Sequence, residues 1–191
     1  PWLATMRGGD DVYLSQTFQT FGISESALDE AVAGAVAPEE GRVAFRAAFP
    51  QVSLRLTVQA RPGEAEERLA RLSERIRERV GEYIYGEDDA TMEGRVGELL
   101  KARGLTIALA ESCSGGLIAH RLTNVAGSSA YVRGGVVAYA NEVKTGQLAV
   151  PAETLREHGA VSEATALAMA RGVRGALAAD LGLAVTGIAG P

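Results

Sequence analysis

The sequence has little of what several classes of protein require. Its one cysteine, Cys113, excludes an internal disulfide framework and a multi-cysteine zinc site. Its two histidines, His120 and His158, are far apart, which argues against a histidine-built metal site. No apolar run approaches the roughly 18 residues of a membrane-spanning helix, and no signal-peptide pattern opens the chain. We therefore expect a cytoplasmic protein with no metal and no membrane partner.

Positive charge is also scarce. The 191 residues hold 19 Lys and Arg against 24 Asp and Glu, which gives a net charge of −5. A chain of this balance lacks a broad basic field for gripping phosphates, so nucleic acid is not an expected partner. What the chain does have is 47% hydrophobic residues, enough for a core without disulfides. Its 23 glycines crowd the second half, where we look for the chemistry.

Both ends of the sequence read as interrupted elements, so we expect a piece of a longer protein. The opening letters PWLATM resemble the tail of a helix, and the closing letters AVTGIAGP resemble a strand that enters an unfinished loop. We expect three parts. These are the tail of a missing N-terminal domain (1–11), a small α+β linking domain (12–86) and an incomplete α/β domain (87–191).

The first domain is expected to be a β-α-β-β-α module. Apolar alternation predicts strands over 12–23, 42–49 and 52–60. Ser24 is an expected N-cap for a helix through residue 36, and Pro62-Gly63 precedes a second helix to about residue 80. The arginines of this second helix alternate with acids, which indicates a solvated face with ion pairs rather than a nucleic-acid surface.

The second domain alternates helices with short buried strands. Helices are expected over 91–103, 117–123, 151–157 and 162–177, and strands over 106–110, 135–140 and 183–186. This alternation predicts a three-layer α/β domain with a mainly parallel sheet.

One loop offers several groups that could do chemistry. The segment ALAESCSGG, residues 108–116, runs from a buried strand into a helix. Ligands of open α/β sheets bind beyond the carboxyl ends of strands, and Gly115 and Gly116 would let a ligand approach the backbone. The helix start is expected to present unpaired N–H groups to an oxyanion or phosphate, beside the hydroxyls of Ser112 and Ser114. The alternative is a plain turn in which Ser114 caps the helix.

Further segments are expected at the same edge of the sheet. A buried strand leads into Tyr139, Asn141 and Lys144 in the segment GVVAYANEVK, although Lys144 could instead sit on an outer face. Another strand ends at Thr186 and Gly187 in AVTGIAGP, and the loop with Ser128 and Ser129 could reach the same place. Several such loops at one edge predict a pocket.

Cys113 is the obvious rival nucleophile, because thiolates attack more readily than alcohols. A catalytic cysteine usually has a histidine partner, and His120 stands seven residues along the same helix, roughly 10 Å away. We therefore interpret Cys113 as a packed small residue, and His120 and His158 as surface or helix-packing residues.

Five segments in this order resemble the C-terminal domain of the CinA (competence/damage-inducible) family. They are ALAESCSGG, AGSSAYVRGG, VVAYANEVK, HGAVSEATA and TGIAGP. The charged module before residue 86 resembles the family's linking domain. The first dozen residues resemble the end of an N-terminal domain with a molybdopterin-binding-like fold and ADP-ribose pyrophosphatase activity.

The resemblance implies a nicotinamide mononucleotide deamidase that needs no cofactor. It makes Ser112 the nucleophile, Lys144 the base and Tyr139 an aid to proton transfer. Lysine titrates near 10.4, so Lys144 would have to be desolvated to act as a neutral base. The substrate-binding residues implied are Ser114 (where the family usually has threonine), Gly115, Gly116, Asn141, Thr186 and Gly187.

Other hypotheses remain open from the sequence. The alternative is a non-catalytic module of a competence-related protein that binds a nucleotide or a partner protein. A nucleic-acid role is disfavoured by the acidic balance. By analogy with the family we expect a homodimer.

Overall fold

The computed structural model describes residues 11–188. The chain divides into two compact units, Pro1–Met92 and Glu93–Pro191, and each is described by itself. The sequence places this boundary a few residues earlier, at 86–87. The expected N-terminal tail, apart from residue 11, and the last letters of TGIAGP lie outside the described residues. No helix within the described part of the chain is long and apolar enough to cross a membrane.

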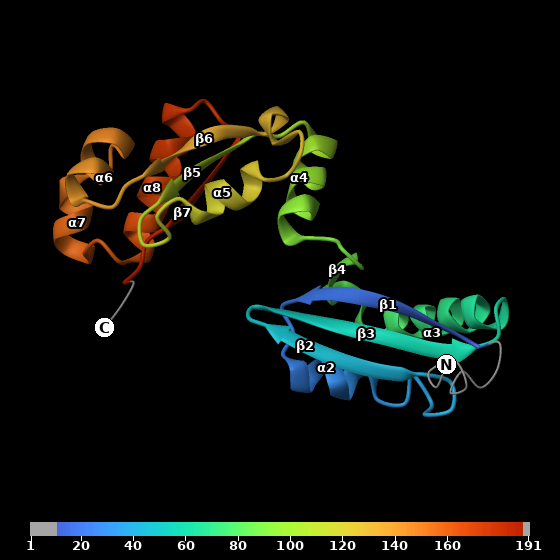
Figure 1. The fold of residues 1–191 in the computed structure, drawn as a ribbon. Coiled ribbons are helices and arrows are strands. Elements are labelled where there is room, and N and C mark those ends of the chain that lie inside the picture. Colours follow the sequence, from blue (N-terminus) through green and yellow to red (C-terminus); the bar gives the residue numbers. More distant parts are fainter. Residues whose placement is uncertain (1–10, 189–191) are drawn as a thin grey trace, which may run out of the picture. The chain divides into compact units, whose positions relative to one another are not determined.

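The first unit is an antiparallel sheet with helices α2 and α3 (Figure 1). Its strands stand in the order β2-β3-β1-β4. A fourth strand, β4, follows the expected β-α-β-β-α module and pairs with β1, and the sequence pattern does not predict it. The elements are β1 (Val12–Phe21), α2 (Glu25–Val32), β2 (Arg42–Ala48), β3 (Gln51–Ala60), α3 (Glu64–Val80), a 3-10 turn (Gly81–Tyr83) and β4 (Ile84–Glu87).

The core of this unit follows from apolar periodicity. Alternate residues of β3, from Val52 to Val58, are buried, and so are Leu72, Ile76 and Val80 along one stripe of α3. Ser24 caps α2 as expected, because its hydroxyl accepts the N–H of Ala27 at 3.3 Å.

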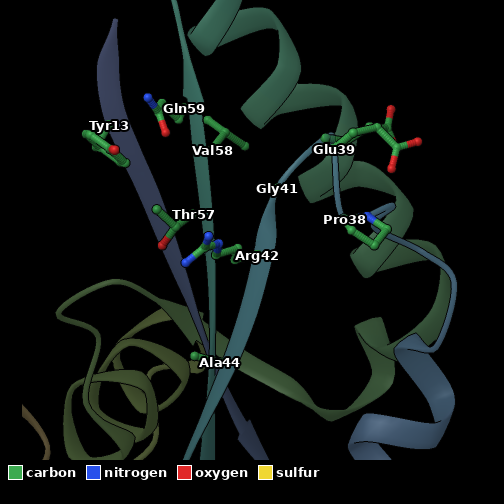
Figure 2. Close-up of a pocket in the computed structure, with 10 residues that line it drawn as sticks. Tyr13, Pro38, Glu39, Gly41, Arg42, Ala44, Thr57, Val58 and Gln59 are labelled. Atoms are coloured by element: carbon green, nitrogen blue, oxygen red, sulfur yellow. The ribbon is translucent and has the colours of Figure 1, made fainter. Parts of the chain in front are cut away.

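The first unit also carries a hollow of about 450 Å³, shown in Figure 2. Tyr13 of β1, Arg42 of β2 and Thr57 of β3 line it. Tyr13 and Arg42 are exposed, so the hollow offers no sequestered nucleophile beside a base. The candidate chemistry therefore lies in the second unit.

The second unit is a parallel sheet in the order β6-β5-β7 with helices on both faces. The expected α/β class is confirmed by this arrangement. Its elements are α4 (Met92–Arg103), β5 (Ile107–Glu111), α5 (Leu117–Thr123), a 3-10 turn (Ser128–Ala130), β6 (Val132–Val137), α6 (Asn141–Leu148), α7 (Ala152–His158), α8 (Glu163–Ala176) and β7 (Leu181–Val185).

Strand β5 separates two small cores. Ile107 and Leu109 pack with Leu122 of α5 and with α4, whereas Ala108 and Ala110 pack with Met169 of α8 and with α6. The alternation arises because successive side chains of a strand point to opposite faces. Residues at the end of β5 are thereby directed to different layers, which decides the geometry of the site.

Two local expectations were wrong. Strand β6 lies three residues before the expected 135–140, because Val132 pairs with Ile107 and the ladder with β5 ends at Val137. Pro151 is the N-cap of α7 rather than a residue of its first turn.

Candidate functional site

One of the two buried charged residues that the structure shows in the second unit is a lysine. Lys144 of α6 is only 2% exposed, although lysine is among the residues least often buried. Its Nζ lies 2.8 Å from the carbonyl oxygen of Ala138 and 3.1 Å from that of Tyr139. The outer-face position that the sequence left open for Lys144 is excluded.

The third partner of this amine is the hydroxyl of Ser112. Lys144 Nζ and Ser112 Oγ are 3.2 Å apart, and Ser112 is 6% exposed. Ser112 follows β5 directly, and its N–H continues the ladder to the carbonyl of Val185. Its side chain points to the same face of the sheet as those of Ala108 and Ala110, which explains why it faces α6. The structure thus brings together two groups that stand 32 positions apart and that the family resemblance pairs.

Burial perturbs the titration of Lys144. Desolvation lowers its pKa below 10.5, and the opposing effects of Cys113 and Glu142 are smaller. The neutral amine is therefore more populated than for a lysine in water.

The loop after Ser112 turns through two glycines. Gly115 and Gly116 have φ of 61° and 99°, a left-handed region that other residues adopt at a cost. Gly116, not Ser114, is the N-cap of α5. The Ser114 hydroxyl is buried without a hydrogen-bond partner among the described residues.

The start of α5 corrects one expectation. Its N–H groups are not unpaired, because Ile118 and Ala119 donate to the carboxylate of Glu111 at 3.0 and 2.7 Å, and Leu117 donates to the Ser114 carbonyl. Gly115 N–H is also engaged, by the carbonyl of Ser112. The helix terminus is therefore not an open anion site.

Glu111 is the residue that sequence reasoning missed. It is 2% exposed and ends β5 inside the ALAESCSGG segment. The signal was available, since an acidic residue at the end of a buried strand and just before a helix needs N–H partners.

The loop that follows β7 reaches the same edge. A Cβ built on Gly187 would lie 3.0 Å from Cys113 Sγ, so the two loops approach closely here and a side chain at 187 would require Cys113 to shift. Thr186 Oγ1 donates to the carbonyl of Ala160 at 2.7 Å, which ties this loop to the HGAVSEATA segment. Thr186 and Gly187 therefore stand beside the Ser112 loop, as the sequence predicts.

Other candidates are placed differently. The Tyr139 side chain is 72% exposed, and only its backbone carbonyl contacts Lys144. Asn141 is exposed at the start of α6. The expectation that Ser128 and Ser129 reach this edge was wrong, because their loop precedes β6 and enters the amino end of the parallel sheet.

The histidines lie outside the pair of Ser112 and Lys144. His120 is exposed and its ring contacts Asn124 at 3.1 Å, and His158 is exposed at the end of α7. Both fit the surface interpretation made from the sequence.

Comparison with known proteins decides the family. The family model described as "CinA C-terminal domain" matches residues 89–191, and that of the "Damage-inducible protein CinA KH domain" matches residues 15–86. The chain belongs to the CinA family.

Curated CinA relatives resemble the chain over nearly all of its length. A CinA-like protein from Geobacter sp. is 49% identical over 177 residues, 92% of this chain and 42% of the relative. A competence-damage inducible protein from Moorella thermoacetica is 48% identical over 182 residues, 95% of this chain and 44% of the relative. The chain thus spans less than half the length of these CinA relatives.

Solved CinA superfamily structures are similar to about half of the chain. A protein from Klebsiella pneumoniae is 42% identical, with a TM-score of 0.51 over 52% of this chain and 62% of that one. A protein from Escherichia coli is 32% identical, with a TM-score of 0.51 over 52% of this chain and 58% of that one.

Proposed function

We propose that the second unit hydrolyses the carboxamide of nicotinamide mononucleotide, giving nicotinate mononucleotide and ammonia. The observation that carries the proposal is the buried contact of 3.2 Å between Lys144 Nζ and Ser112 Oγ at the carboxyl end of a parallel sheet. A buried amine beside a buried alcohol is the arrangement of a serine–lysine amidase. The substrate is the one that the resemblance to the CinA C-terminal domain implies.

The three contacts of Lys144 suit a neutral base. A neutral amine has two N–H groups, which the carbonyls of Ala138 and Tyr139 can accept. Its lone pair is then left for the third direction, toward the hydroxyl of Ser112. In the ammonium form all three partners accept a hydrogen bond from Nζ instead. The same three partners therefore bind the amine before and after it takes the serine proton.

The backbone after Ser112 supplies donors for the oxyanion. Among the described residues, no hydrogen bond occupies the N–H of Cys113 or of Ser114, whereas that of Gly115 is engaged. The N–H of the residue after a serine nucleophile is a recurrent oxyanion donor. One such donor contributes roughly 3–4 kcal/mol to stabilising the transition state.

The proposed reaction has two halves. Ser112 Oγ attacks the carboxamide carbon as its proton passes to Lys144, which then protonates the departing nitrogen, leaving ammonia and an ester on Ser112. Water next attacks the ester, Lys144 takes its proton, and the proton returns to Ser112 as the acid leaves. The phenol of Tyr139 is proposed to assist these transfers from the exposed side.

The remaining side of the site is proposed to hold the nucleotide. Gly115 and Gly116 leave the loop open to a ligand because they carry no side chain. Thr186 donates its proton to Ala160, so its oxygen is left as an acceptor for a substrate hydroxyl. Ser114, Asn141 and Gly187 complete the proposed set.

The test is ammonia release from nicotinamide mononucleotide by the purified protein, compared with its Ser112→Ala variant. We expect turnover by the former and its loss in the latter. The Cys113→Ala variant keeps the backbone N–H and should remain active. A folded but inactive Cys113→Ala would assign the reaction to the thiol. Tight binding of the mononucleotide without turnover would instead favour the non-catalytic module.

The reaction should depend on pH through Lys144. Because burial lowers the pKa of Lys144, the limb of kcat/KM that this group controls should lie below pH 10.5. Below that pKa the ammonium cannot accept the serine proton, so the rate should fall about tenfold per pH unit. A profile of kcat/KM against pH checks this, and a rate independent of pH down to mild acid would contradict it.

A further inference from the structure

The residue beside the nucleophile faces the opposite layer. Glu111 is on the same face of β5 as Ile107 and Leu109, because alternate residues of a strand share a face. Its side chain therefore points to the α4 and α5 layer, away from Lys144. It is one of the few charged side chains buried in the described part of the chain, at 2% exposure. A buried charge without a role is costly, so its contacts are informative.

Glu111 ties three parts of the site together. Its two carboxylate oxygens accept the N–H groups of Ile118 and Ala119 at 3.0 and 2.7 Å, which closes the 112–116 loop onto α5. Its carbonyl accepts the N–H of Ala138 at 2.7 Å. Ala138 is the residue whose own carbonyl holds Lys144 Nζ. The neighbours of both reacting groups are therefore anchored on this residue.

The carboxylate keeps its charge. Burial alone would raise the pKa of Glu111, but the nearby Ser114 hydroxyl and the N–H groups of Ala119 and Ile118 outweigh burial and lower it. The Ser114 hydroxyl lies outside hydrogen-bonding geometry, so the backbone donors are the firm contacts. A charged carboxylate already bonded to these N–H groups is poorly placed to exchange protons with a substrate.

We propose that Glu111 is the positioning residue of the site, and that its carboxylate clamp on α5 sets Ser112 against Lys144. By occupying the N–H groups of α5, the clamp also leaves those of Cys113 and Ser114 as the donors that face a substrate. This inference rests on the proposed amidase function. It assigns Glu111 no contact with the reacting atoms.

The test is the Glu111→Gln variant of the purified protein. Glutamine keeps the shape of the side chain but replaces one carboxylate oxygen by an NH₂ group. That NH₂ group would face a backbone N–H of α5, and two donors cannot form a hydrogen bond. A misplacement of about 1 Å costs roughly 10²-fold in rate, so we expect kcat to fall about 10²-fold. KM should change little, and the pH dependence set by Lys144 should stay in place because its burial and its contacts with the carbonyls of Ala138 and Tyr139 are unchanged.

Asp180 provides a matched control. Its carboxylate accepts the N–H and the hydroxyl of Thr106 at 2.7 and 2.6 Å, so it makes a similar tie where β5 begins, at the other end of the strand. Asp180→Asn should lower stability yet keep kcat. A Glu111→Asp variant keeps the charge with a shorter reach, and it should be impaired like Glu111→Gln.

A second readout does not depend on the substrate. The rate at which a sulfonyl fluoride labels Ser112 should also fall in Glu111→Gln. If the unmodified protein releases no ammonia, the proposed function fails, whereas slower labelling would still support the clamp. Unchanged kcat and labelling in folded Glu111→Gln, an equal loss in Asp180→Asn, or full rescue by Glu111→Asp would each overturn the inference. So would a shift of the pH limb.

Discussion

Replacing Lys144 by methionine is expected to abolish ammonia release while stabilising the fold. Loss of the base should lower kcat by at least about 10³-fold, since a positioned base contributes roughly 10²–10⁴-fold and here also orients the nucleophile. Methionine fills similar space without a charge to desolvate. A functional group that is kept in an unfavourable environment lowers stability, so its removal typically adds roughly 0.5–2 kcal/mol to the free energy of unfolding.

The expected gain in stability depends on pH. The folded-state pKa of Lys144 is depressed, so between that pKa and 10.5 the unfolded chain binds the proton more tightly and the unmodified protein becomes more stable as pH rises. The advantage of Lys144→Met should therefore be largest below the folded-state pKa and shrink toward pH 10.5. Urea denaturation at several pH values, together with the ammonia assay, measures both effects.

Lys101 is the matched control, because it is the other lysine of the sequence. Its Nζ contacts the carbonyl of Ala126 at 3.4 Å and lies 5.5 Å from the ring centre of Tyr131, away from Ser112. Lys101→Met should keep normal turnover. Activity retained in Lys144→Met, or lost equally in both variants, would remove Lys144 from the mechanism.

Replacing Gly172 by alanine is expected to displace α6, the helix that carries Lys144. A Cβ at Gly172 of α8 would lie 1.8 Å from the carbonyl oxygen of Leu148, the last residue of α6. This neighbour is backbone, so α6 must move as a whole. Forcing extra volume into a packed contact costs roughly 1–3 kcal/mol, and the shift should also part Lys144 from Ser112.

Gly175, three residues along α8, is the control for Gly172. A Cβ there meets nothing within 4 Å, so Gly175→Ala should be neutral or stabilise the protein by up to about 1 kcal/mol. Urea denaturation and turnover of the two variants compare a clash with a harmless change on one helix. If Gly172→Ala were as stable and active as Gly175→Ala, the packing that positions Lys144 would be wrong.

The sequence predicted the parts of the site that depend on local pattern. The buried run before Ser112 and the alternation of helices with strands place the serine at the carboxyl edge of a parallel sheet. The pairing of Ser112 with Lys144 came from the family resemblance, because the residues alone left Lys144 free to lie on an outer face. Its burial depends on how α6 packs on α8, which no single segment encodes.

The remaining misses have similar causes. Strand β6 was placed three residues too late because residues 132–134 were assigned to the preceding loop, whereas the register with β5 pairs Val132 with Ile107 and Gly134 with Ala108. The loop with Ser128 and Ser129 was expected at the wrong edge of the sheet, because a loop that precedes a parallel strand lies at the amino end of that strand. Glu111 was missed although its place at the end of a buried strand indicates a need for N–H partners. Which groups donate could not be predicted, because the donors are the backbone N–H groups of Ile118 and Ala119.

The intermediate itself provides the sharpest test. The protein, mixed with nicotinamide mononucleotide and quenched with acid within one turnover, can be digested and analysed by mass spectrometry. An ester between Ser112 and the pyridine acyl group, formed as ammonia is released and absent from Ser112→Ala, is the expected result. An adduct on Cys113, or ammonia release from Ser112→Ala at the normal rate, would contradict the proposed chemistry.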